Sequence, residues 1–202
     1  MPNVFIISAP SGAGKSSLIE ELLKDTSGIA KSVSVTTRKP RDGEQNEVDY
    51  HFTNVDDFKN RIKQNEFIEY AKVHDNFYGT SRTHLTELLE KGVDVILEID
   101  YQGAEIIREE YPDNISIFIL PPNIDELEKR LKNRKSDSNE IISRRLEAAP
   151  QEIAHLTKYQ YVMINSNFTD SVDDLKAIVR SARLRKSEKS KNQILKHFIG
   201  DL

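Results

Sequence analysis

The sequence predicts an α/β fold in which a parallel sheet is wrapped by helices. Short runs rich in Val and Ile, at residues 4–8, 93–99, 116–120 and 161–164, have the length and composition of buried strands. Segments with apolar residues at helical spacing separate these runs. Because parallel strands are joined by long crossovers that are usually helical, the alternation is typical of a parallel sheet with helices on its faces.

The helices follow the strands in order. Residues 16–24 place Leu18, Ile19, Leu22 and Leu23 at helical spacing, and residues 82–91 form a helix that stops at Gly92, which suits a left-handed helix end. Further helices are predicted at 124–133 and 140–149, with a long helical pattern from residue 171 that ends in a basic stretch at 183–196. This order assigns a helix to each connection of the sheet.

Two segments break the alternation. Residues 31–80 read as short alternating strands around one helix, which predicts a small β-rich lobe. Residues 134–139 are polar and without periodicity, which predicts a lid between two helices. We therefore expect one domain over residues 1–202, with a core at 1–30, 81–125 and 147–202, a lobe at 31–80 and a lid at 126–146.

Composition excludes several classes of protein. The 202 residues suit one core, and 29 Lys and Arg against 33 Asp and Glu give a net charge of −4, so no nucleic-acid or membrane partner is expected. With no cysteine, disulfides, a thiol nucleophile and Cys-ligated zinc are excluded. The apolar stretches are strand-sized and no secretory signal is evident, so we expect a cytoplasmic protein without a transmembrane helix.

A phosphate-binding motif lies between the first strand and the first helix: Ala9-Pro10-Ser11-Gly12-Ala13-Gly14-Lys15-Ser16, followed by Ser17. Glycines let backbone N–H groups turn toward an anion, and the helix N-terminus adds partial positive charge. Lys15 is expected at the β and γ phosphates of ATP, and Ser16 at a bridging Mg²⁺. Ala9 stands where the motif usually begins with glycine, so a left-handed backbone there would carry a small steric cost. ATPases, GTPases and small-molecule kinases all share this loop.

Further motifs lie downstream of the loop. They are Ser34-Val35-Thr36-Thr37-Arg38-Lys39-Pro40-Arg41, Asp49-Tyr50-His51-Phe52, Glu69, Asn76-Phe77-Tyr78-Gly79-Thr80-Ser81, Glu98-Ile99-Asp100-Tyr101-Gln102-Gly103 and Ile119-Leu120-Pro121-Pro122. With the loop, they give a sequence that resembles guanylate kinases, in order, over about residues 4–165. The resemblance implies a P-loop kinase of purine nucleotide metabolism that uses ATP and Mg²⁺ to convert GMP, and dGMP, to the diphosphate.

Four residues are expected to bind the acceptor phosphate. Two Arg forks, Arg38 and Arg41, suit a phosphate monoester, and Tyr50 and Tyr78 can each donate a phenolic hydrogen bond. The resemblance assigns all four to this role.

Four others are expected at the guanine base. Guanine offers two N–H donors beside a carbonyl, which a carboxylate and hydroxyls complement. Glu69 fits the carboxylate, and the resemblance implies that Ser34, Thr80 and Asp100 assist. Adenine would leave a buried carboxylate unpaired, so we expect AMP to be rejected by a factor of ~10⁴.

Transfer to a phosphate oxygen needs charge stabilisation and no catalytic base. The resemblance implies that Arg134 and Arg145 clamp the transferring phosphoryl group, with Arg130 a weaker candidate, and that Asn165 approaches the adenine. The expected catalytic residues are Lys15, Arg38, Arg41, Arg134 and Arg145. Three positions depart from the usual family pattern: Ala9, Lys135 in place of glycine, and Glu98 in place of aspartate.

Alternatives to this interpretation remain open. Taken singly, the arginines could be surface charges, the tyrosines half-buried strand residues and Glu69 an exposed strand residue. A P-loop kinase for another acceptor is the rival enzyme. A non-catalytic guanylate-kinase-like module that binds protein partners is the rival from another class. The sequence predicts no oligomeric state.

Overall fold

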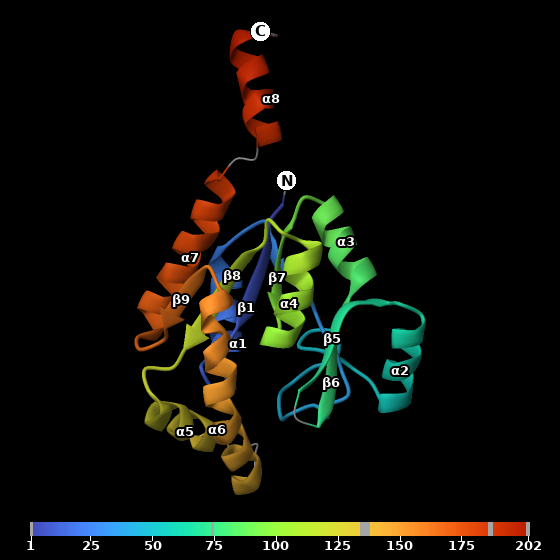
Figure 1. Ribbon diagram of the computed structural model, residues 1–202, viewed down its shortest axis with the longest axis vertical. Helices are drawn as coiled ribbons and strands as arrows, with labels where there is room; N and C mark the ends of the chain where they lie inside the picture. The colour runs from blue at the N-terminus through green and yellow to red at the C-terminus, as the bar shows by residue number, and fades with distance from the viewer. Residues whose placement is uncertain (1, 74, 134–137, 186–187, 201–202) are drawn as a thin grey trace.

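A five-stranded parallel sheet forms the centre of the molecule. The computed structural model describes residues 2–73, 75–133, 138–185 and 188–200. Within them the sheet runs in the order β2-β7-β1-β8-β9, with helices on both faces (Figure 1). Its strands are β2 (Ile29–Lys31), β7 (Asp94–Glu98), β1 (Val4–Ser8), β8 (Ile115–Leu120) and β9 (Tyr161–Ile164). The predicted α/β fold class is confirmed, while β2, only three residues long, gave no signal in the sequence.

Alternate side chains of β1 enter two cores, one on each face of the sheet. Phe5 and Ile7 pack with α1 (Lys15–Asp25) and α7 (Phe168–Leu184). Val4 and Ile6 pack on the opposite side with α3 (Arg82–Glu90) and α4 (Tyr101–Glu110). This period of two fixes β1 at the centre, so the loop that follows it is held on a buried strand.

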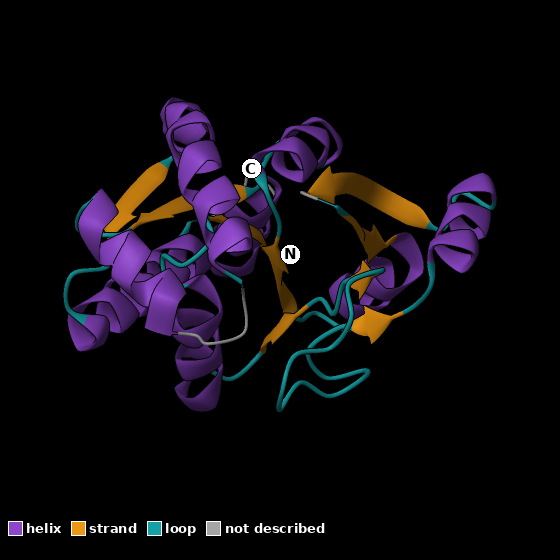
Figure 2. Cartoon of the chain, turned by 90° about the horizontal axis from the view of Figure 1, so that it is seen from below, coloured by secondary structure: helices purple, strands orange, loops and turns teal. Residues whose placement is uncertain are grey.

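A second, four-stranded sheet carries the lobe, in the order β4-β3-β6-β5. Its strands are β3 (Val35–Thr36), β4 (His51–Phe52), β5 (Phe67–Val73) and β6 (Asn76–Ser81), with α2 (Val55–Lys63) packed against them. Viewed from below, this sheet lies apart from the core sheet and is bordered by long loops (Figure 2). The pairing of β5 with β6 is antiparallel and contains a bulge between Phe67 and Glu69.

The helices α5 (Ile124–Asn133) and α6 (Asn139–Ala154) form a separate unit with its own small cluster around Leu127, Leu131 and Ile142. The predicted helix end at residue 149 is wrong, because α6 continues through Pro150. A short 3-10 turn, η1 (His155–Lys158), follows. The single long tail helix is also wrong: α7 begins at Phe168, and a separate α8 (Glu188–Ile199) extends away from the core (Figure 1). No helix within the described ranges is long and apolar enough to cross a membrane.

Candidate active site

The phosphate-binding loop has the backbone that its glycines permit. Gly12 and Gly14 have φ values of 99° and 95°, in the left-handed region that favours glycine. A Cβ atom on Gly14 would lie 2.5 Å from Asn165 Nδ2, so space as well as φ requires glycine there. Among the described non-glycine residues only Glu47 and Asn65 have positive φ, so the steric cost considered at Ala9 does not arise.

Two side chains support this loop from behind. The carbonyl oxygen of Ala13 accepts hydrogen bonds from Asn165 Nδ2 at 2.8 Å and from Arg130 Nη1 at 3.2 Å. Arg130 Nη2 also donates to the Asn165 carbonyl at 3.0 Å. Asn165 is buried and does not line the pocket, and Ser17 is exposed. A contact of Asn165 with adenine therefore stays a prediction, whereas its support of the loop is a feature of this structure.

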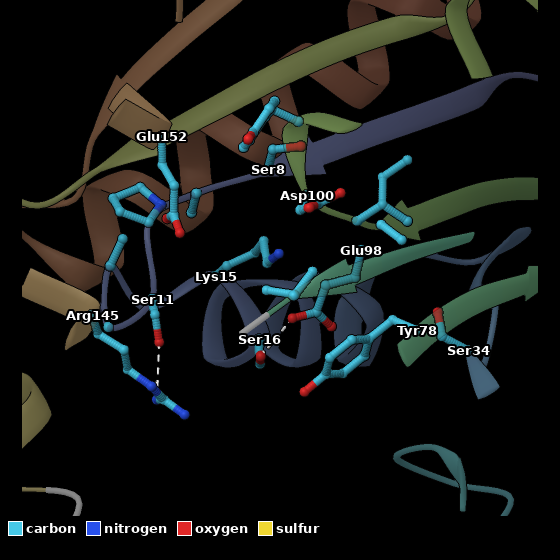
Figure 3. A pocket seen from close by; sticks show the side chains of 18 of the residues that line it. Ser8, Ser11, Lys15, Ser16, Ser34, Tyr78, Glu98, Asp100, Arg145 and Glu152 are labelled. Atoms are coloured by element: carbon cyan, nitrogen blue, oxygen red, sulfur yellow. Dashed lines mark hydrogen bonds between the residues drawn. The ribbon is translucent and has the colours of Figure 1, made fainter. Parts of the chain in front are cut away.

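Ser16 and Glu98 provide adjacent oxygen atoms at the mouth of the loop. Ser16 Oγ donates to Glu98 Oε1 at 2.6 Å (Figure 3). Lys31 Nζ lies 3.9 Å from Glu98 Oε2. A hydroxyl and a carboxylate are ligands that Mg²⁺ accepts, and Mg²⁺ sites commonly use few protein ligands besides substrate phosphates. The longer side chain of Glu98 thus reaches the residue expected at the metal.

Helix α6 brings two charged side chains to the loop. Arg145 Nη1 donates to Ser11 Oγ at 3.0 Å, and Glu152, two turns farther on, lines the same pocket (Figure 3). Burial raises the pKa of Glu152, and the positive charge of Lys15 opposes that rise. Glu152 belongs to no motif in the sequence, and its only sequence signal is a seven-residue spacing from Arg145. Arg134, expected beside Arg145, lies outside the described residues, as does Lys135.

The four residues expected at the acceptor phosphate meet in the lobe. Arg38, Arg41, Tyr50 and Tyr78 all line the pocket. The rings of Tyr50 and Tyr78 have centroids 6.0 Å apart, and the Arg38 guanidinium lies 5.3 Å from the centre of the Tyr50 ring. Burial raises the pKa of Tyr50, so its hydroxyl keeps its proton and can donate it in a hydrogen bond.

The residues expected at the base come from both the lobe and the core: Ser34, Glu69 and Thr80 lie in the lobe, and Asp100 precedes α4. Glu69 is only 4% exposed, and Thr80 Oγ1 donates to its Oε1 at 2.5 Å. Burial raises the pKa of Glu69 to about 7; the Thr80 hydrogen bond opposes the rise and the nearby Asp100 charge adds to it. Asp100 Oδ1 accepts from the Gly103 N–H at 2.9 Å and so caps α4. The exposed-strand reading of Glu69 is wrong.

One pocket joins these parts. It is lined by the loop from Ala9, Pro10, Ser11, Gly12, Ala13, Gly14 and Lys15 to Ser16, by Arg145 and by Ser34, Arg38, Arg41, Tyr50, Glu69, Tyr78 and Asp100. Thr80 is fully buried behind Glu69. The phosphate-binding loop follows β1 of the core sheet, whereas the buried carboxylate of Glu69 lies on β5 of the lobe sheet. Both line the same pocket.

Comparison with known proteins agrees with this geometry. A family model described as "Guanylate kinase" matches residues 1–182. The guanylate kinase of Methylobacillus flagellatus is 51% identical over 186 residues, which span 92% of each chain. The chain belongs to the guanylate kinase family. A guanylate kinase of Vibrio parahaemolyticus is 49% identical over 189 residues, covering 93% of this chain and 91% of that protein.

Solved structures extend the likeness to three dimensions. The crystal structure of guanylate kinase from Anaplasma phagocytophilum matches 100% of this chain and 97% of that chain, with a TM-score of 0.82 and 32% sequence identity. The predicted membership of the guanylate kinase family is thus confirmed over residues 1–182.

Proposed function

We propose that this chain transfers the γ-phosphoryl group of ATP to GMP, giving ADP and GDP. The observation that carries the proposal is the single pocket that joins the phosphate-binding loop to the buried Glu69. Membership of the guanylate kinase family supports the same reaction. dGMP presents the same base and phosphate and is an expected second acceptor.

On the donor side, charge neutralisation is the main task. Backbone N–H groups of the loop and the amino group of Lys15 would face the β and γ phosphates. Arg145, whose hydrogen bond to Ser11 of the loop supports this role, would contact the transferring group, with Arg134 as its companion. No general base is required, because the attacking oxygen of GMP already carries negative charge.

On the acceptor side, the phosphate and the base are held by different groups. Arg38, Arg41, Tyr50 and Tyr78 would donate hydrogen bonds to the phosphate of GMP. The Glu69 carboxylate would accept from guanine N1–H and the exocyclic amine, with Ser34, Thr80 and Asp100 nearby. Holding both ends of GMP fixes its phosphate in line with the γ-phosphoryl group of ATP.

Mg²⁺ is the cofactor we propose. Ser16 Oγ and Glu98 Oε1 are the oxygen atoms that would hold it or its water ligands beside the loop. When bound, Mg²⁺ neutralises charge on the β and γ phosphates. A lone pair of Ser16 Oγ would bind the metal while its O–H could still donate to Glu98, whose other carboxylate oxygen lies near Lys31.

The two rivals predict different chemistry. A kinase for another acceptor would not need the buried carboxylate of Glu69 with its Thr80 partner. A protein-binding module would not need Lys15 and Ser16 in an open phosphate loop. This chain has both features, and they favour a kinase whose acceptor is GMP.

A coupled assay of ADP release, with ATP and Mg²⁺, tests the proposal against GMP, dGMP, AMP, CMP and UMP. We expect turnover with GMP and dGMP and rates with AMP lower by a factor of ~10⁴. Equal turnover with AMP and GMP would overturn the role of Glu69. Absence of turnover with every acceptor would favour the binding module.

A further inference from the structure

Arg38 is held on several sides before any substrate is present. Its side chain is only 12% exposed, and its guanidinium lies 5.3 Å from the Tyr50 ring centre and 5.8 Å from that of Phe52. Arg38 Nη1 donates to the Lys39 carbonyl at 2.8 Å. A long cationic side chain fixed in this way has little rotamer freedom left to lose on binding an anion.

Glu44 makes the strongest of these contacts. Its Oε2 accepts from Arg38 Nη1 at 2.9 Å and its Oε1 from Arg38 Nη2 at 2.8 Å, which is an end-on bidentate pair. The same carboxylate accepts the Arg41 backbone N–H at 2.7 Å, while the Glu44 N–H donates to the Arg41 carbonyl at 3.1 Å. Glu44 therefore fixes the Arg38 guanidinium and closes the turn that carries Arg41.

This pairing leaves one edge of the Arg38 fork for a ligand. A guanidinium has five N–H groups, and the end formed by Nη1 and Nη2 is taken by Glu44. Within the described part of the chain, Arg38 Nε has no hydrogen-bond partner, and Nε and Nη2 form the side edge of the fork. That edge can bind two oxygens of a phosphate monoester.

We propose that Glu44 is a positioning residue, which orients the Arg38 guanidinium so that its Nε and Nη2 edge receives the phosphate of the acceptor nucleotide. Glu44 itself touches Arg38 and Arg41 and need not touch substrate. Burial opposes ionisation of Glu44, but the hydrogen bonds from Arg38 and Arg41 outweigh it and lower its pKa, so the carboxylate is charged when the nucleotide arrives. The inference rests on the proposed function, which supplies the acceptor.

The same contacts of Glu44 with Arg38 and Arg41 would also be seen if Glu44 opposed substrate binding. A carboxylate on two phosphate-binding arginines could compete with the substrate, and its removal would then strengthen binding. The two roles predict opposite changes in affinity, so the sign of the change decides between them.

Affinity for GMP and for guanosine, measured by calorimetry, and KM and kcat from the ADP-release assay test the proposal. For Glu44→Gln we expect KM and Kd for GMP to rise about tenfold, while KM for ATP and Kd for guanosine stay within about twofold. Glu47→Gln is the matched control, because it removes the same charge from an exposed side chain of the same loop and should leave all four values unchanged. Thermal unfolding of each variant checks the fold.

A double-mutant cycle separates positioning from a general structural effect. In an Arg38→Ala background, Glu44→Gln should add less than about twofold to KM for GMP, because the side chain that it orients is gone. A full tenfold effect in that background would overturn the proposal, as would tighter GMP binding by Glu44→Gln alone. A wild-type chain that binds GMP but makes no GDP would overturn the proposed function and leave the binding comparison valid. Wild-type failure to bind GMP would overturn both.

Discussion

The donor and acceptor halves of the pocket present different groups to a ligand. In the donor half, the backbone of the loop lines the pocket, and two left-handed glycines and the Asn165 and Arg130 contacts to Ala13 fix its conformation. In the acceptor half, side chains line the pocket, and two of them are already paired: Arg38 with Glu44, and Glu69 with Thr80. Because a backbone nest can bind many polyphosphates, whereas paired side chains favour one ligand, we expect the acceptor half to determine selectivity.

Removing the charge of Lys15 should impair the function of the donor half and leave GMP binding in the acceptor half unchanged. For Lys15→Ala we expect turnover to fall by about 10³-fold, because a charge aimed at the transferring group is lost, while calorimetric affinity for GMP stays unchanged. Lys24→Ala, an exposed lysine at the end of the same helix, is the control and should keep wild-type rates. Near-normal turnover by Lys15→Ala would refute the assignment of the loop.

Glu69→Gln should break the acceptor half at the base and leave the donor half intact. The amide can accept only one of the two guanine N–H bonds and directs its own donors at the other, so kcat/KM for GMP should fall about 10²-fold, with KM for ATP unchanged. The AMP to GMP ratio of kcat/KM should rise in the same assay. Glu87→Gln, on the exposed face of α3, is the control. An unchanged ratio would show that base selection lies elsewhere.

Titration of Glu69 should sharpen the comparison, because Glu69 lies in the lobe, whereas Glu152, the other pocket carboxylate whose pKa burial raises, lies beside the phosphate loop. With its pKa raised to about 7, Glu69 is ionised and able to accept above pH 7, and protonated below it. Affinity for guanosine should therefore fall as pH decreases, to about one tenth at pH 6 of its value at pH 8. Guanosine is the probe because a phosphate monoester titrates near pH 6 itself. A flat profile between pH 6 and pH 8, or the same slope in Glu69→Gln, would contradict this prediction.

The halves also differ in how far the sequence could predict them. The loop from Ala9 to Ser16 is contiguous and lies between a strand and a helix, so its geometry follows from local rules. The acceptor residues are spread over a second sheet, and the chemistry of Arg38 or Glu69 singly is ordinary. They became specific only through the order of motifs that the guanylate kinase family shares.

The features that could not be predicted from the sequence depend on long-range packing. Glu152 and Glu44 carry no motif of their own, and only the fold brings Glu152 to the loop and Glu44 to Arg38. The continuation of α6 through Pro150 was missed because proline usually ends a helix. Before Pro150, Ile142 and Ala149 pack with Leu127 and Leu131. After it, Ile153 packs against the core cluster that contains Leu97 and Phe118, so the helix is held on both sides of the proline.

The smallest predicted effect concerns Gly103, which faces Glu69 from α4. A Cβ atom there would lie 2.4 Å from Glu69 Oε2 and 3.0 Å from its Cδ, so Gly103→Ala must displace the carboxylate. Because Gly103 is helical, the substitution itself favours the helix by roughly 0.5–1 kcal/mol. We therefore expect KM for GMP to rise about fivefold and KM for ATP to stay constant, with no loss in the free energy of unfolding.

Gly103→Ala should weaken GMP binding without lowering the free energy of unfolding, whereas a substitution that disrupts core packing lowers stability as well. Gly92→Ala is the contrasting variant: its φ is 76°, a Cβ there would meet no atom within 4 Å, and it lies away from the pocket. It should lower the free energy of unfolding by about 1 kcal/mol and leave KM for GMP unchanged. If Gly103→Ala destabilised the fold like Gly92→Ala while binding GMP normally, the Glu69 carboxylate would tolerate displacement, and the acceptor half would be less closely fitted to one ligand than its paired side chains indicate.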